Sequence, residues 1–176
     1  MKKTVWTYGL IAGAIMALMM AITIPNSEKM GDYGEIIGYT TMIVAFLMVY
    51  FGIRSYRDNV QGGVIGFGRA FKLGILIALV GSTCYVVAWQ VLYHTVASDF
   101  TEKYAASEIK KARKSGATDA QIEAKKKEMA EFGEMYKNPF VNVGMTYLEV
   151  FPVGLVVALV SAGALSRRKA AAGVSA

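Results

Sequence analysis

The chain has 176 residues and a formal net charge of +6; 55% of its residues are apolar and 18% are charged. A chain this apolar is not an ordinary small soluble domain, and its single cysteine, Cys84, excludes an intrachain disulfide. The basic residues cluster beside long uncharged segments instead of forming one patch, so the composition argues against nucleic acid as a partner.

Four windows with at most one charge each are long enough to cross a membrane. In a helix that rises about 1.5 Å per residue, roughly 20 apolar residues cover the ~30 Å of hydrocarbon in a bilayer. Backbone groups in lipid must be satisfied within the segment, so such windows predict helices. We expect one all-α membrane domain over residues 1–176, with four transmembrane helices near 5–24, 36–53, 73–93 and 141–165.

The first window follows Met1-Lys2-Lys3 and therefore resembles a signal peptide. Its apolar run, Val5 to Ile24, exceeds the ~7 to 15 residues of a signal h-region, and no small-x-small cleavage site precedes Pro25. We interpret it as a span. Small residues recur in it at every fourth position and predict a stripe for close helix packing, either within the chain or in a homo-oligomer: Gly9, Gly13, Ala17 and Ala21.

A basic, glycine-rich segment separates the second and third windows. Gly62 to Gly68 lacks the strand-before-helix context of a dinucleotide fold and the Gly-Lys-Ser/Thr ending of a P-loop, so a phosphate cradle is a weak interpretation. We expect the segment to lie at the lipid headgroups, where four basic side chains contact anionic lipid of the bilayer: Arg54, Arg57, Arg69 and Lys72.

The same region carries a family resemblance. The run Gly66-Phe67-Gly68-Arg69-Ala70-Phe71-Lys72-Leu73-Gly74, the span after it and the pair Asp99-Phe100 are similar to an uncharacterised bacterial family, a domain-of-unknown-function group of small four-helix membrane proteins. The resemblance covers Thr4 to Arg168. It implies a bacterial inner-membrane protein with four spans, and it implies no activity and no catalytic residue.

Residues 98–138 form a polar insertion between the third and fourth windows. Asp99 is a candidate cap for a helix that reaches Lys114, and Thr118 with Gln121 predicts a capping box for a second helix. We expect a helical hairpin whose apolar seams face each other or a partner. The seams consist of Phe100, Tyr104 and Ile109 on the first helix and of Ile122, Met129, Phe132 and Tyr136 on the second.

The charge asymmetry predicts an orientation. If both termini and the loop between the second and third windows share one side, that side has nine basic residues and one acidic residue. Basic residues close to span ends mark the cytoplasmic side. We therefore expect both termini in the cytoplasm and an extracytoplasmic hairpin. The nine basic residues of 98–138 are the main argument against this orientation, although long translocated loops tolerate positive charge.

Glu149 is the only formal charge inside a window. At 100° per residue, polar residues share a face with it on the fourth helix, and the third helix has a comparable polar face. The residues are Asn142 and Thr146 on the fourth helix and Thr83, Gln90 and His94 on the third. We expect the two faces to meet, with a neutral carboxyl group that donates to Gln90 or Thr83 as a structural contact or within a proton or cation site.

The sequence contains no familiar catalytic or metal-binding motif. A single histidine, His94, cannot form a multi-histidine metal site, and neither His-Glu-x-x-His nor Gly-x-Ser-x-Gly is present. We expect no enzyme activity, no cofactor and no metal. The leading interpretation is a structural or interaction protein of the bacterial inner membrane that binds an envelope protein through the hairpin. The alternative is a small transporter or channel component that uses Glu149 for proton or cation handling.

Overall fold

The structure is a computed structural model that describes residues 1–26 and 33–166. Every regular element in these two ranges is helical, which confirms the predicted all-α fold for the described residues. The elements are α1 (Lys2–Thr23), the 3-10 turn η1 (Ile24–Asn26), α3 (Gly34–Val60), α4 (Phe67–Thr95), α5 (Phe100–Lys114), α6 (Asp119–Tyr136) and α7 (Pro139–Leu165).

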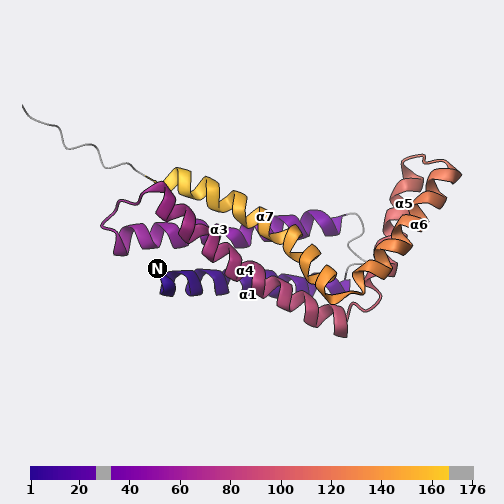
Figure 1. The fold of residues 1–176 in the computed structure, drawn as a ribbon, viewed down its shortest axis with the longest axis horizontal. Coiled ribbons are helices and arrows are strands. Elements are labelled where there is room, and N and C mark those ends of the chain that lie inside the picture. The colour runs from indigo at the N-terminus through magenta and orange to yellow at the C-terminus, as the bar shows by residue number, and fades with distance from the viewer. Residues whose placement is uncertain (27–32, 167–176) are drawn as a thin grey trace, which may run out of the picture.

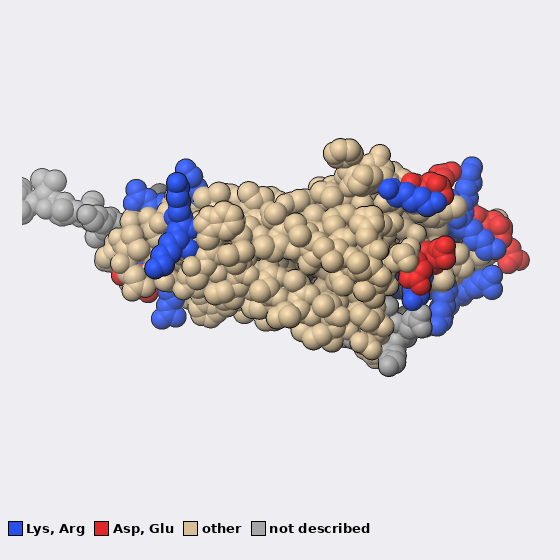
Figure 2. Space-filling view, turned by 90° about the horizontal axis from the view of Figure 1, so that it is seen from below, with Lys and Arg blue, Asp and Glu red and all other residues tan. Residues whose placement is uncertain are grey.

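Four of the described helices are long and apolar enough to cross a membrane: α1 with η1, α3, α4 and α7. They pack side by side, and α4 contacts the other three (Figure 1). On the face shown in Figure 2, a wide central belt carries no Lys, Arg, Asp or Glu, and the charged groups gather at the two ends. This distribution fits helices whose middle parts lie in hydrocarbon and whose ends meet water.

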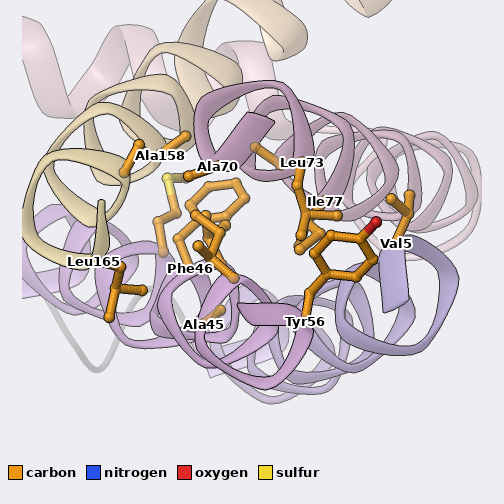
Figure 3. Close-up of a cluster of buried hydrophobic side chains, with 14 of the residues drawn as sticks. Val5, Ala45, Phe46, Tyr56, Ala70, Leu73, Ile77, Ala158 and Leu165 are labelled. Carbon is orange, nitrogen blue, oxygen red and sulfur yellow. The ribbon is translucent and has the colours of Figure 1, made fainter. Parts of the chain in front are cut away.

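The main core lies where α3, α4 and α7 meet, and α1 adds side chains at its edge. Figure 3 shows that Phe46 of α3 lies among aliphatic side chains from neighbouring helices, including Leu73 and Ile77 of α4. These three side chains are fully buried. Because the helices are apolar all round, the core is distinguished from the outer surface by side-chain size and fit.

Helices α4 and α7 are antiparallel and approach closely because small residues recur in both at every fourth position. A Cβ atom on Gly74 would lie 2.9 Å from the Cβ of Ala158, and one on Gly154 would lie 2.9 Å from that of Ala78. The same register places Gln90 beside Asn142. Two facing ridges result: Ala70, Gly74, Ala78, Ser82, Val86 and Gln90 on α4, and Ala162, Ala158, Gly154, Val150, Thr146 and Asn142 on α7.

Helices α1 and α4 are also held at short range by glycine. A Cβ on Gly13 would lie 2.3 Å from the Cβ of Cys84, and one on Gly9 would lie 2.6 Å from the Cβ of Val80. Real Cβ atoms do not approach so closely, so both positions require glycine in this packing. The predicted small-residue stripe of α1 is therefore used within the chain at these two positions.

The connection between α3 and α4 is a short glycine turn. Helix α3 continues to Val60, and Gly62 and Gly63 follow with φ angles of 64° and 86°, in the left-handed region that favours glycine. The Gly63 N–H donates to the carbonyl oxygen of Arg57 at 2.9 Å and closes the end of α3. Helix α4 already begins at Phe67, so the break is shorter than the predicted segment 62–68.

Helices α5 and α6 pack against each other and lie beyond one end of the long helices, whereas the start of α1 and the end of α7 lie at the other end (Figure 1). The predicted capping box is present, since the Thr118 hydroxyl accepts from the Gln121 N–H and the Gln121 side chain accepts from the Thr118 N–H. Asp99 occupies the N-cap position of α5, but its carboxylate makes no capping hydrogen bond and pairs with Lys103 at 3.1 Å.

Candidate functional site at the junction of α4, α6 and α7

A buried hydrogen bond joins the α5–α6 pair to α4. The indole Nε1 of Trp89 donates to the phenol oxygen of Tyr136 at 2.9 Å. Trp89 lies on α4, and Tyr136 is the last residue of α6, two positions before the α7 N-cap Asn138. The Asn138 side chain accepts from the Phe140 N–H at 3.0 Å and fixes the start of α7. The ends of three helices are therefore tied together here.

Aromatic rings surround this hydrogen bond. The ring centroids of Trp89 and Phe100 are 4.8 Å apart with nearly perpendicular planes, and those of Tyr93 and Tyr136 are 5.6 Å apart with a similar angle. Such edge-to-face pairs contribute about 0.5–1.5 kcal/mol beyond the burial of their surface. The cluster packs the start of α5 and the end of α6 against α4 and fixes the position of the α5–α6 pair relative to that helix.

The apolar seams predicted on α5 and α6 face each other. Tyr104 of α5 contacts Phe132 of α6 with ring centroids 5.6 Å apart, and Ile122 and Met129 of α6 are buried. The seams therefore contact each other within the pair, but the seam residues of α5 are only partly buried, and Ile109 and Met129 line a groove between the two helices. The pair therefore leaves part of its apolar seams accessible in this groove, beside its polar and charged surface.

Tyr136 is an unusual tyrosine because of its surroundings. Burial raises the pKa of its phenol, while hydrogen bonds with Thr146 and Trp89 act in the opposite direction. The net shift is upward. The phenol is therefore neutral under physiological conditions and works as a hydrogen-bonding group between α4 and α7.

Polar side chains connect α4 and α7 at two points. The Gln90 amide Nε2 donates to the Asn142 Oδ1 at 2.7 Å, and the hydroxyl oxygens of Thr83 and Tyr147 are 2.8 Å apart. Asn142 is 1% exposed, and its backbone carbonyl also accepts from the Thr146 hydroxyl at 2.8 Å. The structure thus brings Gln90 together with Asn142, while the partner of Thr83 is Tyr147, a residue outside the predicted polar face.

Glu149 does not join these contacts. Its side chain is exposed on the surface of α7, it forms no hydrogen bond or ion pair within residues 1–26 and 33–166, and it interacts electrostatically with Tyr85 and Tyr136. The buried ridge of α7 advances four residues at a time and so turns by about 40° per step, which leaves Glu149 roughly 100° away from the buried Val150. The expected bond from Glu149 to Gln90 or Thr83 differs from the observed arrangement for this reason.

The other predicted site residues lie apart from the junction. His94 is exposed in the last turn of α4, with its ring 5.3 Å from that of Tyr93. The predicted headgroup residues lie at the opposite end of the long helices, and three of them have polar partners. Arg57 and Arg54 pair with Asp58 at 2.7 and 3.8 Å, Arg69 donates to Gln61, and Lys72 is exposed.

Sequence reasoning missed the Trp89–Tyr136 contact, although a signal was present. Aromatic residues cluster where the third window ends and the insertion begins and ends: Trp89, Tyr93, Phe100 and Tyr136. Aromatic residues at a span end are also typical of a membrane interface, so their number alone does not reveal that they pack together. Within the described residues, no group of three or more His, Cys, Asp or Glu side chains is placed to hold a metal ion.

These features define a class of protein. Four helices long and apolar enough to cross a membrane, with charges at their ends, fit an integral multi-pass membrane protein of unknown activity. The chain belongs to a known family, since residues 7–167 match the family described as "Protein of unknown function (DUF4199)". The predicted resemblance to a family of unknown function that spans most of the chain is thereby confirmed. Comparison with curated proteins and with solved structures returns no match for the chain.

Proposed function

We propose that the protein is a non-enzymatic interaction protein of a bacterial inner membrane. In this proposal, α1, α3, α4 and α7 form a membrane-spanning bundle that holds the α5–α6 hairpin at a fixed position outside the cytoplasm, where the hairpin binds an envelope protein. The observation that carries the proposal is the buried Trp89–Tyr136 hydrogen bond within its aromatic cluster. A loop that only connected two spans would not require a fixed position relative to α4, whereas a binding surface does.

The distribution of charge supports the orientation. The start of α1 and the turn between α3 and α4 carry six basic residues and one acidic residue among those described: Lys2, Lys3, Arg54, Arg57, Arg69 and Lys72 against Asp58. An excess of basic residues close to span ends favours the cytoplasmic side. The α5–α6 pair at the other end has balanced charge, much of it in short-range pairs such as Lys126–Glu123 at 2.6 Å and Lys137–Glu134 at 2.7 Å.

The exposed surface of the hairpin supports contact with a protein. A groove of about 280 Å³ runs between α5 and α6, with Ile109 and Met129 among its apolar residues and Lys126 and Glu102 among its charged ones. An apolar floor with a polar rim is the usual composition of protein–protein contacts. The mixed charge favours a protein surface with groups of both signs as the partner.

Site-specific photo-cross-linking in intact membranes tests the proposal. A photoreactive residue replaces Glu131, whose side chain is 71% exposed on α6, and a matched control places it at Leu148, which is 75% exposed on α7. We expect a discrete protein adduct from position 131 and none from position 148. Lipid adducts or no adducts at position 131, or the same protein adduct from both positions, would contradict the proposal.

Cysteine labelling tests the orientation separately. In a variant with Cys84→Ser, a cysteine at Lys127 should react with an impermeant reagent in whole spheroplasts, since this side chain is 82% exposed on α6. A cysteine at Lys3 should react only after the membrane is opened. The reverse pattern would show that the hairpin is cytoplasmic.

A second candidate function is proton or cation transfer across the membrane. It is favoured by Glu149, which is the only formal charge within α7 and lies ten residues from the first residue of that helix. An ionisable side chain within a span is costly and is a functional candidate for that reason. The Glu149→Gln variant separates the two candidates. If the protein transports an ion, the variant loses proton- or cation-dependent flux in proteoliposomes. If the protein acts through the hairpin, the variant gives the same cross-linking at position 131 as the parent.

A further inference from the structure

A small cavity lies between the end of α1 and the start of α3, at the end of the long helices where α5 and α6 lie. Its volume is about 120 Å³, and four methionines line it: Met16, Met19 and Met20 from α1 and Met42 from α3. Tyr85 of α4 also contributes to its wall. Ligand sites for organic molecules of drug size take about 300–1,000 Å³, so this cavity suits an ion or a few small atoms.

The chain places these thioethers together by helical spacing. Met16, Met19 and Met20 stand at positions i, i+3 and i+4 of α1, and therefore lie on one face of the helix. Met16, Met20 and Met42 are 1%, 6% and 3% exposed, and Met19 is half-buried, so protein encloses three of the four side chains and part of the fourth. Two helices thus direct the same donor type at one space.

The opposite wall leaves the space open. Gly34 and Gly38 of α3 line the cavity, and a Cβ atom added at either glycine would meet no atom of the described residues within 4 Å. At other helical glycines of this protein, such as Gly13 and Gly74, the added atom would collide with a neighbouring helix. The glycines beside the cavity therefore do not serve close helix packing.

The donor set selects a class of metal ion. Thioether sulfur is a soft, neutral ligand that favours Cu(I), whereas Mg²⁺, Ca²⁺ and other hard cations require oxygen ligands, mostly carboxylates. No Asp, Glu, His or Cys is among the described residues that line the cavity. Neutral ligands in a low-dielectric site also favour a monovalent over a divalent ion, because less charge is removed from water.

We propose that Met16, Met19, Met20 and Met42 form a binding site for a soft monovalent metal ion, Cu(I). The proposal does not rest on the interaction function, but the site borders the Trp89–Tyr136 junction, because Met20 belongs to the same buried cluster as Trp89 and Tyr136. The test below therefore leaves Met20 unchanged. The competing account is that flexible methionines only fill an irregular gap in the core, which is a common use of this residue. The two accounts predict different metal binding.

The test uses the full chain, purified in detergent with Cys84→Ala so that the thiol does not contribute. Cu(I) is titrated under anaerobic, reducing conditions against a coloured chelator, and Ag(I) serves as a redox-inert probe. We expect a single ion per chain, and a loss of affinity of about tenfold or more in the Met16→Leu/Met42→Leu variant. Leucine nearly conserves the volume of methionine, so the fold should be retained at a cost below about 1.5 kcal/mol per substitution.

The matched control is Met129→Leu/Met135→Leu on α6, which changes two methionines outside the cavity. This variant should bind Cu(I) as tightly as the parent, and X-ray absorption of the parent complex should show sulfur as the main ligand. The proposal is overturned if the parent binds no Cu(I) or Ag(I), if both double variants lose affinity equally, or if the cavity variant keeps the affinity of the parent while remaining folded.

Discussion

The indole nitrogen of Trp89 and the phenol oxygen of Tyr136 are 2.9 Å apart, although the residues are separated by 47 positions in the chain. Both side chains are nearly buried, at 5% and 6% exposure. The contact brings the end of α6, where the chain enters α7, back against α4. It therefore couples the position of the α5–α6 pair to the packing of the long helices.

Tyr136→Phe should loosen this coupling. The variant keeps the ring contacts but removes the acceptor of the Trp89 N–H, and a buried donor without a partner costs about 1–3 kcal/mol. We expect the free energy of unfolding to fall by this amount and amide hydrogen exchange to rise in α5 and α6. Tyr33→Phe, at a position that is 71% exposed, is the control and should change neither quantity. Equal behaviour of the two variants would show that the hydrogen bond contributes nothing.

Alkaline pH should act through the same tyrosine. Burial raises the pKa of Tyr136 in the folded protein above the value of about 10 in an unfolded chain. A group with a raised pKa contributes stability that is fully present below the unfolded pKa and is lost as pH rises through the folded pKa. Between pH values just below and well above ~10, the parent should therefore lose more stability than Tyr136→Phe. Parallel losses in parent and variant would contradict the assignment.

The α4–α7 ridge predicts a compensating pair of substitutions. Gly74→Ala should lower stability by about 1–3 kcal/mol through overpacking, because the new Cβ would lie 2.9 Å from that of Ala158. Adding Ala158→Gly should restore part of the loss. Gly144→Ala is the control on α7, since none of the residues that the structure describes has an atom within 4 Å of its added Cβ, and it should stabilise the helix by roughly 0.5–1 kcal/mol. Failure of Ala158→Gly to rescue would disprove the predicted register.

The number and type of the helices could be predicted from the sequence because the windows are long and the caps are local. Thr118 and Gln121 satisfy each other within one turn, so their capping box requires no knowledge of the tertiary structure. A window of about 20 apolar residues likewise needs only its own length to indicate a span. Both features depend only on interactions within a short segment, so they can be predicted without the tertiary structure.

The packing of the helices was harder to predict, because in an apolar helix every face is apolar. Gly74 and Gly154 recur at the same spacing as Gly9 and Gly13, but nothing in one helix shows which neighbour its small residues will meet. The predicted contact of Glu149 with Gln90 or Thr83 differs from the structure for a related reason. The prediction kept one fixed face for α7, whereas the buried ridge turns around the helix as it follows steps of four.

The two caps of the α5–α6 pair should differ in strength. Thr118→Ala removes a side chain that accepts the Gln121 N–H and should cost α6 about 1 kcal/mol. Asp99→Ala removes only the exposed pair with Lys103, since the aspartate makes no capping hydrogen bond, and should cost ~0.5 kcal/mol or less. Residue-resolved hydrogen exchange at the first turns of α5 and α6 measures both. A larger effect of Asp99→Ala would mean that its carboxylate caps the helix in solution.

Glu149 and Asn142 provide the sharpest comparison, because they are polar residues on the same helix with opposite surroundings. Glu149 is exposed on α7 and has no hydrogen bond within the described part of the chain, whereas Asn142 is buried and accepts from Gln90 at 2.7 Å. Glu149→Leu should therefore raise stability in a bilayer, since it removes an ionisable group whose insertion is costly, by up to ~2.5–3.5 kcal/mol on the scale for charged residues. Asn142→Leu should lower stability by about 1–3 kcal/mol, because it leaves the Gln90 amide without its acceptor.

Equilibrium unfolding in mixed detergent, or steric trapping in bicelles, measures both variants on the same scale. The opposite signs follow from the turn of the buried ridge, which covers Asn142 and passes by Glu149. If Glu149→Leu destabilises the protein as much as Asn142→Leu, the carboxyl group is held by contacts that stabilise the fold. If it stabilises the protein while Glu149→Gln abolishes flux, the carboxyl group is retained at a cost in stability for transport, and the second candidate function gains over the first.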